Sequence, residues 1–165
     1  GVELAPYWLH SGHLLKEGRK MSKSKENVLY TEDLEKRGYS PSEIRFYLMY
    51  GKWRRTRNLT KEDMASSVHK LRDLKRIIEL VEKASGERTD GRAKGIMNGL
   101  EDAFRRSMND NMEIRGAFDA LYGRVKRLEK YAVSVRIGEE DAFECISVLR
   151  RIDTVIGFIF PDCPQ

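Results

Sequence analysis

The sequence predicts a mainly α protein, in which a helical bundle follows a short extended or hairpin segment and a loop rich in lysine and serine. Apolar residues recur every three or four positions over most of the chain after residue 40. Strong helix-capping residues stand at the start of several of these stretches. A chain of 165 residues can bury one modest core, so we expect one compact unit.

Residues 5–18 alternate weakly between apolar and polar character, which favours an extended segment or a small hairpin. Tyr7 and Trp8 in this segment either pack into a core or line a nucleotide site, and we expect the core. His10 and His13 have no third metal ligand nearby, so the sequence predicts no metal site here.

The next stretch, Lys20-Met21-Ser22-Lys23-Ser24, places two lysines and two hydroxyls in one loop, which suits a polyphosphate. When a reaction attacks the α-phosphate of ATP, negative charge grows on the departing phosphates, and two ammonium groups held there would lower the barrier. Lysine is a mobile point charge on a long stem, and serine hydroxyls can donate hydrogen bonds. All five residues are therefore candidates for ATP binding, with Lys20 and Lys23 as the candidate catalytic residues. Composition alone favours a solvated polar loop.

Two short helices should follow an extended stretch over residues 27–30. Thr31 is expected to cap the first of them and Gly38 to end it. The second begins at Ser40 and Pro41 with Glu43 completing a capping box, the strongest helix start in the chain. Its predicted inner face consists of Ile44, Tyr47 and Leu48.

Residues 50–58 interleave aromatic and basic side chains in what should be a loop, a pattern typical of contacts to RNA phosphates and stacked bases. The candidate RNA-binding residues are Lys52, Trp53, Arg54, Arg55 and Arg57. A solvated loop that Trp53 anchors to the core would show the same pattern, and both interpretations stay open.

The remainder should be helical. Thr60 and Asp63 open a long helix that ends near residues 85–86, and residues 85–91 have the composition of a flexible linker. Further helices are expected over residues 96–108, 117–131 and 143–159, with a break at 109–111. Their apolar stripes should pack together as a bundle.

The formal net charge of +5 favours a polyanionic partner without requiring one. Cys145 and Cys163 form no CxxC pattern, so a reducing cytoplasm is the expected setting. No stretch approaches the roughly 18 consecutive apolar residues of a membrane span, and we expect no membrane association.

The run from Tyr7 to His13, followed by Gly18 to Ser24, resembles the end of a class I aminoacyl-tRNA synthetase catalytic domain and is most similar to cysteinyl-tRNA synthetases. In that family a Tyr-Trp-x-His-x-Gly-His segment leads into the KMSKS signature, which residues 20–24 match. The resemblance covers nearly the whole chain. It continues through residues 40–48, 53–54, 58, 108–110 and 150–152.

The resemblance implies that residues 1–60 are the end of the catalytic domain, with the KMSKS loop and a connector contacting the tRNA stem. Residues 61–165 would form an anticodon-binding-like bundle of the DALR type. Mg-ATP would be the substrate bound at the KMSKS loop, and tRNA the partner. The family places its HIGH signature and zinc ligands upstream of Tyr7, so zinc is expected only in that N-terminal half, which would be a further partner if the gene is split.

The chain also departs from the family. Lys25-Glu26-Asn27 follows the signature where Leu-Gly-Asn or Lys-Gly-Asn is usual, so Glu26 replaces a hinge-like glycine and can pair with a signature lysine. The family's acidic run also appears here in altered form, at residues 109–115.

We therefore expect the C-terminal part of a cysteine–tRNA ligase, inactive when isolated from the HIGH and zinc half. The alternative is a stand-alone non-catalytic synthetase paralogue that binds RNA or protein. A cysteine ligase acting on a small amino-sugar would share the same adenylation chemistry.

Overall fold

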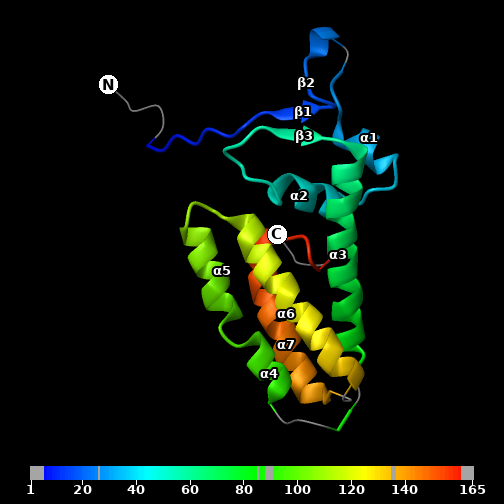
Figure 1. Cartoon of the computed structure of the whole chain (residues 1–165), viewed down its shortest axis with the longest axis vertical. Coiled ribbons are helices and arrows are strands. Elements are labelled where there is room, and N and C mark those ends of the chain that lie inside the picture. The colour runs from blue at the N-terminus through cyan, green and yellow to red at the C-terminus, as the bar shows by residue number, and fades with distance from the viewer. Residues whose placement is uncertain (1–5, 26, 85, 88–90, 135–136, 161–165) are drawn as a thin grey trace.

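The computed structural model describes residues 6–25, 27–84, 86–87, 91–134 and 137–160, and the mainly α fold class is confirmed. A small sheet and two short helices lie at one end of a bundle of longer helices (Figure 1). The strands are β1 (Leu14–Lys16), β2 (Arg19–Lys20) and β3 (Arg57–Leu59). The helices are α1 (Thr31–Glu35), α2 (Pro41–Met49), α3 (Lys61–Glu82), α4 (Arg92–Met97), α5 (Leu100–Asn109), α6 (Ile114–Ser134) and α7 (Glu139–Ile156).

The sheet has the order β2-β1-β3. β1 pairs with β2 antiparallel, with Leu15 opposite Lys20, and with β3 parallel, with Leu15 opposite Asn58. A hairpin is thus present, but over residues 14–20 rather than within residues 5–18, and it turns at Glu17 and Gly18, both with positive φ. β3 begins inside residues 50–58, for which we expected only loop. That prediction was wrong because a three-residue strand is stabilised by a partner about 40 residues away, which local pattern cannot reveal.

The two strongest predicted helix starts are confirmed. The Ser40 hydroxyl accepts a hydrogen bond from the Glu43 N–H at 3.3 Å, and the Glu43 carboxylate accepts one from the Ser40 N–H at 2.9 Å. At the start of α3 the Thr60 hydroxyl accepts from the Asp63 N–H at 3.1 Å. These bonds satisfy N–H groups that a helix leaves without partners, so they define where α2 and α3 begin.

Two helix boundaries differ from expectation. Thr31 is the first residue of α1 rather than its cap; Tyr30 holds the cap position, and its N–H donates to the Asp33 carboxylate at 3.0 Å. The helix expected over residues 96–108 is divided into α4 and α5, because Gly99 adopts φ +69°, a left-handed conformation that ends a helical turn.

The bundle also ends earlier than predicted. α7 stops at Ile156, and the chain turns through Gly157 so that residues 158–160 are buried outside the helix. The buried Asp153 carboxylate stabilises this turn by accepting from the N–H groups of Phe158, Ile159 and Phe160, at 3.0, 2.9 and 2.9 Å. Phe143, assigned to the apolar stripe, is 73% exposed instead.

Helix α2 is shared between two apolar clusters. Ile44 and Tyr47 pack into the smaller cluster, under the sheet, whereas Phe46 and Tyr50 pack into the bundle core. The Phe46 ring centroid lies 4.5 Å from that of Phe118 on α6. Leu48, predicted to face inward, is 50% exposed. α3 likewise contributes to both clusters, so α2 and α3 hold the sheet to the bundle; the division of domains after residue 60 stays a prediction.

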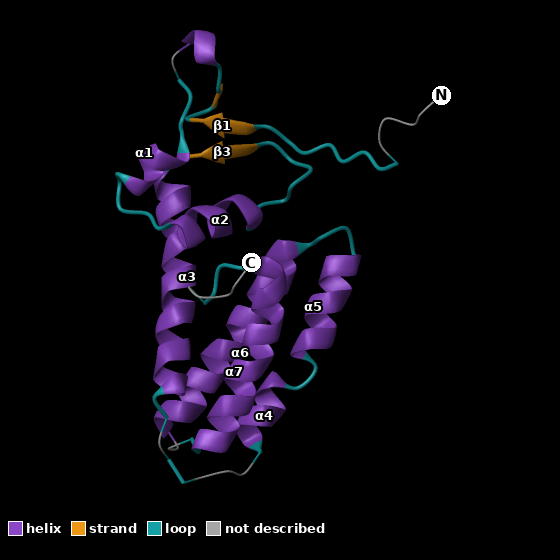
Figure 2. Cartoon of the chain, turned by 180° about the vertical axis from the view of Figure 1, so that it is seen from behind, coloured by secondary structure: helices purple, strands orange, loops and turns teal. Residues whose placement is uncertain are grey.

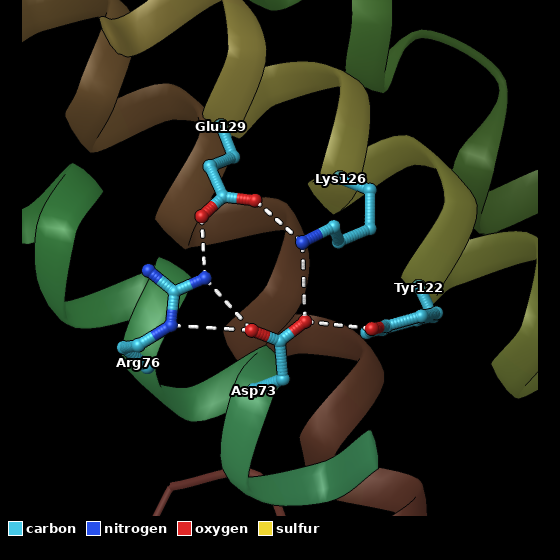
Figure 3. Close-up of polar contacts among 5 residues, drawn as sticks. All are labelled: Asp73, Arg76, Tyr122, Lys126 and Glu129. Atoms are coloured by element: carbon cyan, nitrogen blue, oxygen red, sulfur yellow. Dashed lines mark hydrogen bonds and ion pairs between the residues drawn. The ribbon is translucent and has the colours of Figure 1, made fainter. Parts of the chain in front are cut away.

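A polar network joins α3 to α6 beside the core (Figure 3). The Asp73 carboxylate accepts hydrogen bonds from Arg76 at 2.7 Å, from the Tyr122 hydroxyl at 2.6 Å and from Lys126 at 3.2 Å. Glu129 accepts from both Arg76 and Lys126. The Tyr122 hydrogen bond and the two cations lower the pKa of Asp73 to about 2. This carboxylate is therefore ionised across the physiological range.

Within the part of the chain that the structure describes, every helix is too short or too polar to cross a bilayer.

Candidate functional site: the KMSKS loop and the basic loop

The loop predicted to bind ATP follows β2 directly and projects away from the bundle (Figure 2). Lys20 is the last residue of β2, and Lys23 and Ser24 lie in a short 3-10 turn, Lys23–Lys25. All three side chains are exposed, whereas Met21 and Ser22 are half-buried. Neither Lys20 nor Lys23 forms an ion pair with another described residue. Both ammonium groups are thus accessible to an anion.

Asn27 closes this loop at its base. Its Oδ1 accepts a hydrogen bond from the Ser22 N–H at 2.8 Å, and its Nδ2 donates to the Lys20 carbonyl at 3.0 Å. The Ser22 and Ser24 hydroxyls bond to each other at 2.8 Å. One side chain therefore holds both sides of the signature together. Sequence reasoning did not assign Asn27 this role, although the Asn that follows the signature in the family pattern was a signal. Glu26 lies outside the described residues.

The hairpin is tied to β3 at its turn. The Gly18 N–H donates to Asn58 Oδ1 at 2.6 Å, and the Glu17 N–H donates to the Leu59 carbonyl at 3.2 Å. Since β3 leads directly into α3, the β1–β2 hairpin from which the KMSKS loop projects is connected to the longest helix of the bundle.

Arg57, one of the predicted RNA contacts, is held by protein groups. Its guanidinium lies 3.7 Å from the Tyr47 ring centroid, bonds to Asp63 at 3.0 Å and donates to the Tyr47 carbonyl. The Tyr47 hydroxyl also donates to Asp63, at 2.8 Å. Burial, and then this bond to Asp63, raise the pKa of Tyr47, so the hydroxyl stays a donor. The RNA role of Arg57 stays a prediction, while its present contacts brace β3 against α2 and α3.

Trp53 anchors the basic loop at two points. Its indole N–H donates to the Asn111 carbonyl in the α5–α6 turn at 2.8 Å, and its carbonyl accepts from the Gly12 N–H at 2.7 Å. The Arg54 guanidinium lies over the Trp53 ring, 4.6 Å from its centroid. The loop therefore links the lead-in to β1 with the bundle through hydrogen bonds, although Trp53 belongs to neither apolar cluster. The RNA-contact interpretation is untested by these bonds.

Lys52 and Arg55 are exposed, and they line two open grooves on either side of the loop. One groove, of about 300 Å³, lies between the loop and residues 110–113. The other, of about 400 Å³, lies between the loop, β3, α3 and the start of α6, where Arg115 lines it. Sequence reasoning missed Arg115 because the two ends of this groove are about 60 residues apart.

The N-terminal aromatic residues do not form a core among the described residues. Tyr7 is 90% exposed and Trp8 69%, so the expectation that they pack inside was wrong for this structure. The Trp8 ring stacks on His10, with centroids 6.5 Å apart. Among the residues that are described, no group of three His, Cys, Asp or Glu side chains could hold a metal ion.

Comparison with known proteins relates this chain to a class of enzymes. Residues 1–69 match the family described as "tRNA synthetases class I (C) catalytic domain". The chain is also 30% identical to the cysteine–tRNA ligase of Chlamydia pneumoniae, over 96% of this chain and 34% of the relative. The ligase of Chlamydia felis is 31% identical over 93% of the chain and 33% of its own length. That of Protochlamydia amoebophila is 23% identical over 96% and 33%.

The chain is therefore homologous to the class I aminoacyl-tRNA synthetases. Within that class, its homologues are cysteine–tRNA ligases. It spans about a third of the length of these curated relatives.

Proposed function

We propose that this chain is the part of a cysteine–tRNA ligase that contributes the KMSKS loop and RNA-contacting helices to the ATP-dependent cysteinylation of tRNA. The observation that carries the proposal is the pair of exposed side chains of Lys20 and Lys23 on one projecting loop, in a chain homologous to such ligases. Mg-ATP is the proposed substrate at this loop, and tRNA is the proposed acceptor.

The geometry supports an electrostatic role for the two lysines. Charge builds up on the β- and γ-phosphates of ATP as the bond to the α-phosphate breaks, and cations placed there in advance stabilise the transition state more than the ground state. The Asn27 bridge limits the conformations of the loop, which lowers the entropy lost when it closes on phosphates. The Ser22 N–H is already bonded to Asn27, so the side chains rather than that amide supply the donors.

The resemblance to cysteinyl-tRNA synthetases assigns cysteine selection and the positioning of the α-phosphate to the half that carries the HIGH signature and the zinc ligands, on the same polypeptide or a separate one. Without that half the 165-residue chain should show no cysteine-dependent exchange of pyrophosphate into ATP, because a leaving-group site alone cannot position the reactants. The cytoplasmic location stays a prediction.

The test is Lys23→Ala in a full-length or reconstituted enzyme that carries this chain. The adenylation rate should fall roughly 10²- to 10³-fold, about 3–4 kcal/mol, with a much smaller change in ATP affinity, as expected for one preorganised donor. Lys23→Arg should not restore full activity, because a planar fork cannot follow the path of a point charge. The matched control is Lys36→Ala, an exposed lysine just after α1, which should keep the wild-type rate.

A higher Michaelis constant for ATP at unchanged turnover would make Lys23 a ground-state binder and refute the mechanism. An enzyme in which neither Lys20 nor Lys23 affects exchange would favour the alternative, a non-catalytic paralogue that binds RNA or protein.

A further inference from the structure

The two grooves beside the basic loop differ in charge. The groove toward residues 110–113 is lined by Lys52, Arg54 and Arg55 but also by the carboxylates of Asp110 and Glu113. In the groove toward α6, four cations face a single carboxylate, that of Asp63, and Arg57 already pairs with it at 3.0 Å. The cations there are Lys52, Arg55, Arg57 and Arg115. The groove toward α6 is thus the strongly positive one.

Of these four cations, Arg115 is the one that a helix supplies. It is the second residue of α6, its side chain is 54% exposed, and its guanidinium lies 5.1 Å from the Tyr50 ring centroid. The Arg115 Nε lies 4.0 Å from Asp119 Oδ2. The other oxygen of that carboxylate, Oδ1, already accepts from Lys70 and from the Tyr50 hydroxyl. The Tyr50 ring therefore positions the arginine, and Asp119 neutralises it weakly.

The start of α6 explains the position of Arg115 only in part. Arg115 forms an i,i+4 pair with Asp119, but the first turn of α6 contains no acidic residue, and a positive charge at a helix N-terminus is mildly unfavourable. The Glu113 carboxylate, which precedes α6, already accepts from the Gly116 N–H at 3.4 Å, so the helix end itself is not an open anion site. The positive potential of the groove therefore comes from the Arg115 side chain and the cations of the loop.

We propose that this groove binds a backbone phosphate of RNA between Arg115 of α6 and the Lys52 and Arg55 side chains of the loop. The inference rests on the proposed function, which makes an RNA the partner. The Thr56 and Ser67 side chains in the lining can donate further hydrogen bonds, and arginine, lysine and hydroxyl groups are the usual phosphate contacts. No aliphatic side chain lines the groove, and a protein partner would need apolar anchors there.

The test measures binding of a fluorescently labelled tRNA transcript to the full chain by anisotropy, from about 50 to about 200 mM salt. Arg115→Gln should weaken binding about three- to tenfold and reduce the slope of log affinity against log salt by about 1, the value for one phosphate contact. Arg115→Lys should keep most of the slope. The matched control is Arg106→Gln, which removes an exposed arginine of α5 that lines neither groove and should leave both quantities unchanged.

An Arg115→Gln protein that melts like the wild type and binds the transcript with unchanged slope would overturn the proposal. Equal losses of transcript affinity in the Arg115 and Arg106 variants would also overturn the proposal, because they would indicate nonspecific attraction between the positively charged surface and the RNA. Polyglutamate that binds as tightly as the transcript, with the same dependence on Arg115, would instead indicate an acidic protein partner. The Lys23 test uses pyrophosphate exchange without RNA, so the two proposals fail separately.

Discussion

Replacing Asp73 by asparagine removes the one carboxylate that three donors share between α3 and α6 (Figure 3). Asparagine has nearly the same shape, so the Tyr122 hydroxyl keeps an acceptor. The side-chain amide N–H₂ then faces Arg76 or Lys126, and both cations lose a negatively charged partner. The perturbation is therefore electrostatic and leaves the apolar core of the bundle unaltered.

The pKa of Asp73 gives the size of the expected change in folding free energy. It falls from an ordinary 3.8 to about 2 in the folded protein. At 1.36 kcal/mol per unit this shift corresponds to about 2 kcal/mol of folding free energy. Asp73 is only 16% exposed, but Arg76 is 54% exposed, so solvent screening reduces the expected loss to about 1–2 kcal/mol.

The sign of the pH dependence follows from the lowered pKa. The ionised carboxylate stabilises the folded state fully at pH above about 4, and the contribution disappears as the pH falls toward about 2. Urea unfolding followed by circular dichroism should therefore show Asp73→Asn to be less stable than wild type at pH 7, with the difference narrowing below pH 4.

Asp102→Asn is the matched control, because Asp102 pairs with Arg105 on the exposed surface of α5 and should change stability by less than about 0.5 kcal/mol. An Asp73→Asn protein as stable as the wild type at pH 7 would refute the reasoning. A stability difference that stayed constant down to pH 2 would refute it too.

Two further predictions concern the supports of the site. Asn27→Ala should lower the adenylation rate of the enzyme about tenfold, because the loop loses the hydrogen bonds that join its two sides. The unfolding free energy should change little, because the apolar core is unaltered. A variant as active as the wild type would show that these hydrogen bonds do not contribute to adenylation. Gly12→Ala should detach the lead-in of β1 from the basic loop, since an added Cβ would lie 2.6 Å from the Thr56 nitrogen and closer still to the Arg55 carbonyl. We expect faster hydrogen exchange at the backbone amide of residue 12 and an unfolding free energy about 1–3 kcal/mol lower than that of the wild type. Gly95→Ala, which meets open space, is its control.

Local interactions were readable in the sequence. The capping box at Ser40 and the cap bond at Thr60 each join residues three positions apart, so they predicted the starts of α2 and α3 correctly. The five contiguous residues of the KMSKS loop carried the resemblance to class I synthetases, and the comparisons support that relationship. Helical periodicity predicted the bundle for the same reason, because it reports on one face of one helix.

The tertiary structure decided what depends on partners far away in the chain. β3 forms because it pairs with the backbone of β1. The Arg57 side chain turns inward because it bonds to Asp63 and lies over the Tyr47 ring. Leu48 and Arg115 show the same limit: an apolar residue on α2 is left exposed, and a cation on α6 meets a loop about 60 residues away. The sequence determines the chemical groups of each side chain, but packing determines which groups surround it. Those surrounding groups decide whether a charged side chain stabilises the fold or remains accessible to a ligand.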